Sequence, residues 1–373
     1  MEPRERCVRA ITRELPDRIP LDFNCRPEPL AELMRALGVD DYERLLRALG
    51  VDFRGTGCVL KGGYRPPLGA KPAREWVYGP TWVVGRVGEY ELAVNIWGVE
   101  VLFAPHTYTY KYHSHPLQRI ELSEYEWPEL DEEATVRLVS EARCRYGEYC
   151  LKAGVEHLWE NAWQLLGFNE AMRLMLRDPA KFERVLDGID RIRLEEAKLL
   201  CDLGVDVIYD GDDVGMQKGM MMSPQLWRRF LKPRYERLAR VIHRRGAFFM
   251  FHSDGWIEPI VPDLIEVGVD ILNPVQPECM DPYRLKELYG DELSFHGTIS
   301  VQTTLPFASP AEVEALVRER IERMGPTGFI LAPTHAIQPG TPIENVLAMY
   351  EAALRYGWVT GARSEAASWG IGL

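Results

Sequence analysis

Phe251-His252-Ser253-Asp254-Gly255 follows the apolar run Ala247–Met250 and places a histidine and an aspartate where that run ends. A second stretch repeats this design, because the apolar residues Gly328–Leu331 lead into Ala332-Pro333-Thr334-His335. Continuous apolar runs are typical of parallel strands that are buried on both faces. In a barrel of parallel strands, the strand ends face one common cup, where catalytic groups collect. We therefore expect His252 and His335 to face the same cup.

Eight short apolar segments occur along the chain, and helical stretches separate most of them. They are Ile19–Phe23, Val51–Gly55, Tyr149–Val155, Val205–Tyr209, Ala247–Phe251, Asp270–Pro274, Leu293–His296 and Gly328–Leu331. The last four alternate with helical segments in the manner of repeated βα units. Eight such strands predict a (β/α)8 TIM barrel of the α/β class. An open doubly wound sheet is the alternative, although no G-x-G-x-x-G motif follows an early strand.

Several helices have clear start signals. Ser309-Pro310-Ala311-Glu312 and Thr341-Pro342-Ile343-Glu344 each combine an N-cap residue, a proline at the first helical position and a capping-box glutamate. Asp178-Pro179, Ser223-Pro224 and Asp281-Pro282 have the same cap followed by proline. These patterns predict five helix starts.

The stretch from about residue 58 to residue 127 interrupts the βα rhythm and is rich in Gly, Pro, Trp and Tyr. Alternating pieces such as Thr81–Val87 and Glu91–Ile96 predict hairpins, and the stretch is too long for a bare loop. We expect a single barrel domain over residues 1–360. A β-rich excursion after the second strand would lie over one end of the barrel, and residues 361–373 would form a C-terminal tail.

Composition excludes several classes of protein. Of 373 residues, 46% are apolar and 27% are charged, which is enough for a large core. The net charge of -12 provides no basic surface for nucleic acid or for an anionic membrane. No signal-peptide pattern opens the sequence, and no apolar run approaches the roughly 20 residues that span a bilayer. We expect a cytoplasmic protein that acts on a small molecule, with neither nucleic acid nor a membrane as partner.

His252 and Asp254 are candidates for a metal site. Residues two apart in an extended segment face the same way. Imidazole and carboxylate are good ligands for Zn²⁺ or Fe²⁺, and two histidines with one carboxylate leave positions open for a substrate. His335 could supply the third ligand from the last strand. In the structural alternative, Asp254-Gly255 forms a turn or caps a helix, and His252 is a hydrogen-bonded core residue.

Three further residues are candidates for catalysis. His296 is a third histidine at a predicted strand end, where it could move a proton, bind the metal or contact the substrate. A hydrogen bond that orders a loop is the alternative role. Asp212 and Asp213 follow the strand Val205–Tyr209, and clustered carboxylates can raise one another's pKa. They can equally belong to a solvated loop.

Four residues are candidates for substrate binding. Arg26 follows the first strand and could hold a substrate carboxylate. Asn273 and Gln276 follow another strand and could orient a substrate, although both residue types also order turns. Met220 belongs to the methionine-rich stretch 215–222, which could form a lid or an apolar wall, or pack in the core.

At these residues the chain resembles the uroporphyrinogen decarboxylase superfamily. That superfamily includes the decarboxylase of haem synthesis and the cobalamin-dependent methyltransferases that pass a methyl group to a thiol. The resemblance begins with Pro3-Arg4-Glu5-Arg6, includes Ile96-Trp97-Gly98-Val99 and the His252 phrase, and ends with residues 331–342. It implies a barrel fold. A methyltransferase would also need a metal, a corrinoid cofactor and a corrinoid protein as partner.

The sequence also departs from the motifs of that superfamily. The methyltransferases bind zinc through H-x-C-G and a second cysteine near the last strand, whereas here Asp254 and His335 occupy those places. The implied ligands are therefore nitrogen and oxygen rather than sulfur. The decarboxylases hold substrate carboxylates with the arginines of an early R-Q-A-G-R stretch. Here Phe23-Asn24-Cys25-Arg26-Pro27 retains one arginine.

Three functions are compatible with these patterns. The first is methyl transfer between a corrinoid and a small acceptor at a zinc or iron site formed by His252, Asp254 and His335, with His296 or Asp212 moving the proton. The second is decarboxylation of a tetrapyrrole, in which Asp212 or Asp213 stabilises a protonated pyrrole. The third is a non-catalytic barrel that binds a corrinoid or a tetrapyrrole.

Overall fold

The computed structural model describes residues 1–73, 79–104 and 110–359. The expected C-terminal tail, residues 361–373, lies outside the described residues. Among the described residues, no helix combines the length and the apolar character needed to cross a bilayer.

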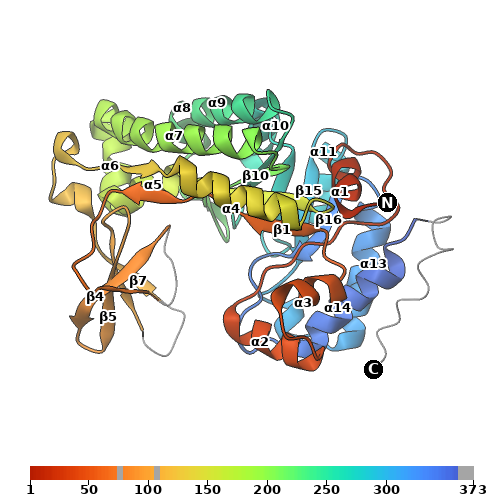
Figure 1. Ribbon diagram of the computed structural model, residues 1–373. Coiled ribbons are helices and arrows are strands. Elements are labelled where there is room, and N and C mark those ends of the chain that lie inside the picture. The colour runs from red at the N-terminus through yellow and green to blue at the C-terminus, as the bar shows by residue number, and fades with distance from the viewer. Residues whose placement is uncertain (74–78, 105–109, 360–373) are drawn as a thin grey trace.

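A curled, parallel, seven-stranded sheet is the centre of the α/β fold (Figure 1). Its strands, in spatial order, are β1 (Phe53–Thr56), β9 (Cys150–Gly154), β10 (Val207–Gly211), β13 (Phe248–His252), β14 (Ile271–Val275), β15 (Ser294–Ile299) and β16 (Phe329–Pro333). Seven of the eight predicted segments are therefore strands, each within three residues of the expected bounds.

The eighth predicted segment, Ile19–Phe23, is extended but forms only isolated bridges. Leu21 pairs in parallel with Leu331 of β16, and the Asp52 amide donates to the Leu21 carbonyl at 2.9 Å. A regular ladder would need a donor at Pro20, which has no N–H. The prediction of a full strand was therefore wrong, yet the segment lies between the two edge strands of the curled sheet.

Helices cover the outer face of this sheet (Figure 1). They are α1 (Pro3–Ile11), α2 (Pro27–Ala36), α3 (Tyr42–Ala48), α4 (Glu132–Arg145), α5 (Leu158–Leu166), α6 (Phe168–Arg177), α7 (Pro179–Asp202), α8 (Pro224–Phe230), α9 (Lys232–His243), α10 (Val261–Val267), α11 (Pro282–Tyr289), α12 (Thr304–Phe307), α13 (Pro310–Met324) and α14 (Ile343–Tyr356). Helix α9 packs between α7 and α10, and α14 packs against α13 and α2.

Four of the five predicted helix starts are confirmed. The side chains of Asp178, Ser223 and Asp281 each accept a hydrogen bond from a backbone amide in the first turn, and Ser309 forms the complete capping box with Glu312. The prediction at Thr341 was wrong by one residue. Pro342 is extended, with ψ of 125°, so it occupies the N-cap position itself and α14 begins at Ile343.

Antiparallel strands occupy the region between β1 and α4. Strand β2 (Leu60–Gly62) pairs with β8 (Pro128–Leu130). A five-stranded sheet contains β3 (Lys71–Pro72), β4 (Thr81–Val87), β5 (Tyr90–Asn95), β6 (Glu100–Phe103) and β7 (Tyr110–Ser114). The hairpin expected near residues 81–96 is present as β4 and β5. Placement of this region over one end of a barrel stays a prediction.

The inner face of the curled sheet changes from apolar to polar along several of its strands. Cys7 and Ile11 of α1 pack into an apolar cluster with the early strand residues Phe53, Cys150, Val207, Met250, Ile271 and Ile330. Because alternate strand residues share a face, the residues two positions later also point inward. Lys152, Tyr209, His252 and Asn273 stand at these positions. The apolar layer therefore closes one end of the sheet, and polar side chains lie above it.

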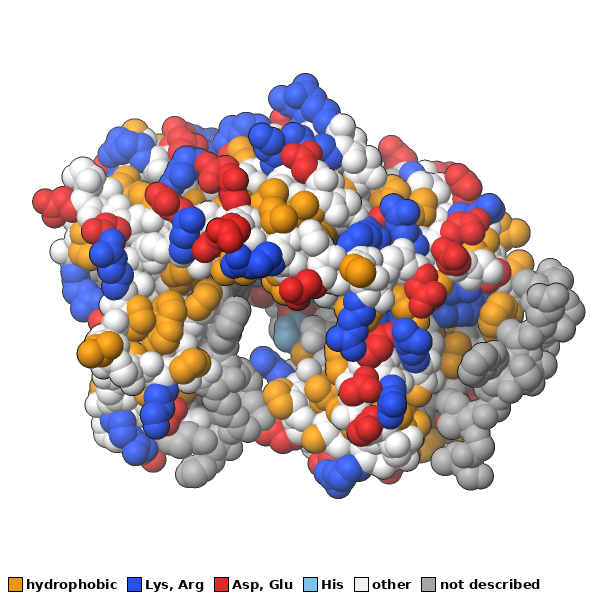
Figure 2. All heavy atoms as spheres, viewed as in Figure 1, with side chains coloured by type: hydrophobic (Ala, Val, Ile, Leu, Met, Phe, Trp, Pro, Cys, Tyr) orange, Lys and Arg blue, Asp and Glu red, His pale blue; other side chains and the backbone are white. Residues whose placement is uncertain are grey.

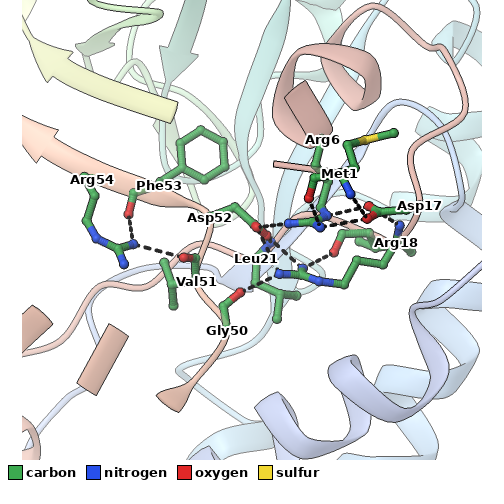
Figure 3. Close-up of polar contacts among 11 residues, drawn as sticks. Met1, Arg6, Asp17, Arg18, Leu21, Gly50, Val51, Asp52, Phe53 and Arg54 are labelled. Carbon is green, nitrogen blue, oxygen red and sulfur yellow. Dashed lines mark hydrogen bonds and ion pairs between the residues drawn. The ribbon is translucent and has the colours of Figure 1, made fainter. Parts of the chain in front are cut away.

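Asp52, directly before β1, joins the N-terminal segment to the sheet (Figure 3). Its buried carboxylate accepts hydrogen bonds from Arg6 at 2.6 Å and from Arg18 at 2.8 and 2.9 Å. It also accepts one from the Leu21 amide at 2.8 Å. Arg6 in turn binds Asp17, so α1, the segment before Leu21 and β1 share one network. Charged groups that lose such a partner in a buried site are strongly destabilising.

Asp52→Asn should lower the free energy of unfolding by about 3–5 kcal/mol, because it removes the anion that two buried guanidinium groups share and leaves Arg6 with Asp17 alone. Urea denaturation measures the change. Glu133→Gln is the control, since it removes an exposed i,i+4 pair with Arg137, which is worth about 0.5 kcal/mol or less. Similar losses in the two variants would contradict a special role for Asp52.

Candidate functional site

A cavity of about 490 Å³ opens at the polar end of the sheet. It brings together the three histidines that the sequence placed at strand ends, His252, His296 and His335. The other polar residues around them include Asp22, Lys152, Tyr209 and Asn273. In Figure 2 this face of the molecule is hollowed, and histidine atoms are visible inside the hollow. The expected convergence of His252 and His335 is confirmed.

His252, the last residue of β13, lies beside two carboxylates. Its Nε2 atom is 3.7 Å from Asp213 Oδ1 and 3.9 Å from Asp254 Oδ1. One ligand atom from each of these three residues lies within 4.8 Å of the others, which is compatible with a shared metal ion. On its other side, the His252 ring contacts Asn273 through Nδ1 and Oδ1 at 2.5 Å. The H-x-D motif thus places both side chains as its spacing predicted.

Backbone hydrogen bonds hold the loops after β10 and β13 together. The Asp254 amide donates to Asp213 Oδ1 at 2.7 Å, and the Asp212 amide donates to the His252 carbonyl at 2.9 Å. The buried Ser253 hydroxyl accepts from the Val214 amide at 3.0 Å. Asp213 is therefore placed beside His252 by the loop that carries Asp254. The sequence indicated catalysis for Asp213 and did not predict this contact.

His335 lies in the same cavity, one step further from the carboxylates. Its ring centroid is 6.4 Å from that of His252. Burial lowers the pKa of His335, and the attraction of Asp254 opposes this shift only in part. The imidazole is therefore neutral near pH 7, which is the form that binds metals. Among the described residues, the closely spaced group contains Asp213 rather than His335.

The surroundings of Asp254 disfavour the ionised form of its carboxyl group. Burial raises its pKa, the neighbouring Asp213 raises it further, and the two histidines oppose these effects. Within the described residues, the ion pairs of Asp213 and Asp254 involve His252 alone. Two carboxylates thus crowd one imidazole.

Asp212 faces away from this group. Its buried carboxylate accepts hydrogen bonds from the Trp159 and Glu160 amides, both at 2.8 Å, and from the Tyr235 hydroxyl. The two amides belong to the first turn of α5, where a negative charge is favourable. Asp212 does not line the cavity. This arrangement explains the residue by its support of α5 and gives no contact through which it would act on a substrate.

A second polar group lies at the cavity floor beside His296. The buried His296 Nε2 lies 2.9 Å from Asp22 Oδ2, and the Lys152 ammonium also binds Asp22. Burial opposes ionisation of Asp22, but Lys152 and His296 outweigh it and keep the pKa of Asp22 well below its usual range. Burial lowers the pKa of His296, which Asp22 only partly offsets. His296 is therefore neutral beside an ionised Asp22.

Asp22 and Lys152 were missed in the sequence, although each interrupts a segment predicted to be a buried apolar strand. A charged residue in such a position is costly unless it has a partner. The signal was therefore present in Ile19–Phe23 and Tyr149–Val155. Their pairing across the sheet was not readable, because 130 residues separate them.

The four expected substrate-binding residues differ in position. Asn273 lines the cavity between His252 and His296. The Gln276 side chain accepts from the Gly255 amide at 3.0 Å, so it orders the loop after β13 instead of lining the cavity. Met220 belongs to a short hairpin, β11 (Gly215–Met216) and β12 (Gly219–Met220), and packs against the core. Arg26 is the N-cap of α2, outside the cavity lining.

Comparison with known proteins places the chain among enzymes. A family model described as "Uroporphyrinogen decarboxylase (URO-D)" matches residues 98–356, more than half of the chain. The methylcobamide:CoM methyltransferase MtaA of Methanosarcina barkeri is 26% identical over 195 residues, or 52% of this chain and 55% of that protein. A uroporphyrinogen decarboxylase of Coxiella burnetii is 22% identical over 198 residues, or 51% of each. The chain thus spans about half the length of the curated relatives it matches.

A solved structure extends the comparison to the whole fold. It is a methyltransferase from Methanosarcina mazei, with a TM-score of 0.65 and 20% sequence identity. The alignment covers 95% of this chain and 99% of that chain. At this level of identity the similarity shows that the fold is shared.

Asp254→Asn should raise the thermal unfolding midpoint of the metal-free protein at about pH 7.5, because it removes a charge that burial and Asp213 disfavour. A carboxyl with a raised folded-state pKa favours folding below its ordinary pKa, and this contribution is lost as the pH rises through the raised value. The gain of the variant should therefore shrink as the pH falls through the raised pKa and Asp254 becomes protonated. Calorimetry in the presence of a chelator measures both midpoints. A lower midpoint for Asp254→Asn at neutral pH would contradict this account.

Proposed function

This chain belongs to the uroporphyrinogen decarboxylase family, and we propose that within it the chain is a metal-dependent methyltransferase. His252, Asp254 and His335 hold a divalent transition metal, zinc or iron, with Asp213 as a further oxygen ligand at hand. The enzyme transfers a methyl group between a corrinoid and a small acceptor. Support for the corrinoid comes from the methylcobamide named for the M. barkeri relative.

The crowding of Asp213 and Asp254 around His252 is the observation that carries this proposal. Three ligand atoms lie within 4.8 Å of one another, and the raised pKa of Asp254 marks a site that lacks positive charge. A divalent cation would relieve that repulsion. Nitrogen and oxygen donors suit zinc or iron, whereas they bind soft metals less well. The donor set therefore fits the metal.

The metal would supply Lewis acidity to an acceptor bound in the cavity, lowering the pKa of its hydroxyl or thiol. The side chains around His252 then have separate tasks. Asp213, whose Oδ1 already accepts from the Asp254 amide, has a second oxygen that can take the acceptor's proton. Tyr209, with its ring centroid 5.4 Å from that of His252, provides an aromatic wall beside the reacting group. His296 binds Asp22 and Asn273 through its two ring nitrogens, so it supports the site and does not serve as the base.

The remaining assignments concern the surroundings of the site. We infer that the curled sheet is a (β/α)8 barrel in which segment 19–23 takes the place of the eighth strand. A corrinoid protein would approach the open end, where Met220 and the β11–β12 hairpin lie on the loop between β10 and α8. Cytoplasmic location and a single domain over residues 1–360 belong to the same proposal.

Decarboxylation of a porphyrinogen is less well supported by the charges in the cavity. Such a substrate carries several carboxylates and needs cations that are not already paired. Of the cavity cations, Lys152 binds Asp22, and Arg54 binds Glu43 at 2.7 Å. Arg26, the one arginine left from the family's early motif, lies outside the lining. A non-catalytic corrinoid-binding role would not explain why Asp213 and Asp254 crowd around His252.

Protein purified without added metal should contain a transition metal, detectable by elemental analysis. His252→Ala and Asp254→Ala should lower metal affinity by about 10–100-fold or more, since each removes a ligand. Comparison of Asp213→Ala with His335→Ala identifies the next ligand. Asp254→Cys should shift preference toward zinc, because a thiolate is softer than a carboxylate. Metal content that is negligible, or unchanged in His252→Ala, would contradict the proposal.

Methyl transfer can be followed through the visible spectrum of methylcobalamin. Incubation with thiol, alcohol or phenol acceptors should cause acceptor-dependent loss of the methylcobalamin spectrum, and His252→Ala should slow it at least about 100-fold. Asp212→Glu serves as a control for loop damage. Uroporphyrinogen should not be consumed. Its turnover by chelator-treated enzyme would favour the decarboxylase instead.

A further inference from the structure

A continuous chain of side-chain hydrogen bonds crosses the cavity floor from Lys152 to His252. Lys152 binds Asp22, and Asp22 Oδ2 lies 2.9 Å from His296 Nε2. His296 Nδ1 contacts the Asn273 amide nitrogen at 2.5 Å, and Asn273 Oδ1 contacts His252 Nδ1 at 2.5 Å. The five residues come from β9, the segment before α2, β15, β14 and β13. Asp22, His296 and Asn273, the three central residues of this chain, are buried.

The direction of each hydrogen bond follows from the charge on Asp22. An ionised carboxylate only accepts, so His296 must carry its proton on Nε2. Neutral His296 then has a bare Nδ1, which accepts from the Asn273 NH₂ group. That orientation turns the Asn273 oxygen toward His252, whose Nδ1 must therefore be protonated. The other nitrogen of His252, Nε2, keeps its lone pair on the side of Asp213 and Asp254, whose nearest oxygens lie beyond hydrogen-bond distance at 3.7 and 3.9 Å.

The reverse order of protons is unfavourable. If Asn273 were turned over, its oxygen would need a proton on His296 Nδ1. The bare Nε2 of His296 would then face the Asp22 carboxylate at 2.9 Å, with two acceptors in contact. A buried polar group without a partner costs about 1–3 kcal/mol. Doubly protonated His296 would avoid the clash, but burial lowers the pKa of this residue.

We propose that Asp22, His296 and Asn273 are positioning residues that hold His252 in the tautomer with its proton on Nδ1 and its lone pair on Nε2. Lys152 supports them by keeping Asp22 charged. This inference rests on the proposed function for the use of that lone pair as a metal ligand. The tautomer itself is a property of the metal-free protein. Asp22 therefore acts on the metal site through three intervening links and without touching any ligand.

This arrangement gives His252 a fixed ring orientation as well as a fixed tautomer. A metal-binding histidine is commonly oriented by an acceptor on its second nitrogen, and loss of that acceptor weakens binding about 10–100-fold. Here the acceptor is an amide, which can turn over. Only the link to His296 and Asp22 decides which end of Asn273 faces His252. Asp22 thus orients the histidine from a distance, whereas in many metal sites a carboxylate bonded directly to the histidine does so.

The tautomer can be read by ¹⁵N NMR of metal-free protein that carries ¹⁵N-labelled histidine. The His252 signals are assigned by their disappearance in His252→Gln. Wild-type protein should show a protonated Nδ1 and a bare Nε2 for this ring. In Asp22→Asn the Asn273 amide loses its fixed direction, so the tautomer with a proton on Nε2 should become populated. Zn²⁺ affinity, measured by competition with a coloured chelator, should fall at least about tenfold.

Two variants of Asn273 give an independent test if Asp22→Asn folds poorly. Asn273→Leu removes both links and should release the tautomer, whereas Asn273→Asp keeps an acceptor for His252 Nδ1 and should preserve both the tautomer and the Zn²⁺ affinity. Asp206→Asn is the matched control, because Asp206 is an equally buried carboxylate with three donors near the opposite end of β10. It should leave the His252 signals unchanged.

Several results would overturn the inference. One is a wild-type His252 protonated on Nε2. Another is an unchanged tautomer in both Asp22→Asn and Asn273→Leu, and a third is an equal change in Asp206→Asn. If wild-type protein binds no Zn²⁺, the proposed function fails, while the NMR result in metal-free protein still decides whether these residues position His252.

Discussion

The carboxylate of Asp52 links three parts of the chain: helix α1, the segment around Leu21 and the start of β1. Arg6 from α1, Arg18 and the Leu21 amide from the next segment all donate to it, directly before β1 begins. The segment around Leu21 forms only isolated bridges with the sheet, so the side-chain bonds to Asp52 add to a few backbone bonds in fixing its register. Asp22 follows Leu21 at once. The position of a carboxylate on the cavity floor therefore depends on the ion pairs at the other end of the sheet.

The two ends of the curled sheet differ because strands such as β13 and β14 have an apolar residue and then a polar residue on the same face. Met250 and His252 lie on the same face of β13, and Ile271 and Asn273 lie on the same face of β14. The first of each pair joins the apolar cluster that α1 closes, and the second lines the cavity. Burial of the apolar layer keeps the strands in register. That register sets His252, Asn273 and His296 beside one another, where hydrogen bonds link their side chains.

The group of Asp213, His252 and Asp254, for which we propose metal binding, is built from two loops. Asp213 and Asp254 follow different strands, and the bond from the Asp254 amide to Asp213 brings them together. Family membership supports an enzyme, and relatives with both methyltransferase and decarboxylase names share part of its sequence. Our proposal of methyl transfer rests on the local charges, since acidic groups crowd His252 while Lys152 and Arg54 are already paired. The choice between the two activities in our proposal rests more on the chemistry of the site than on similarity to either relative.

Local sequence determined most of the strands, four helix starts and the convergence of His252 with His335, because apolar runs, caps and strand ends depend on neighbouring residues. It also gave the shared direction of His252 and Asp254, which follows from their spacing. Only the tertiary structure decided that Asp213 joins these residues while Asp212 turns to cap α5. It alone revealed the contacts of Asp22 with Lys152 and His296, across 130 and 274 residues of sequence. These contacts depend on the curvature and register of the whole sheet, so no local sequence pattern predicts them.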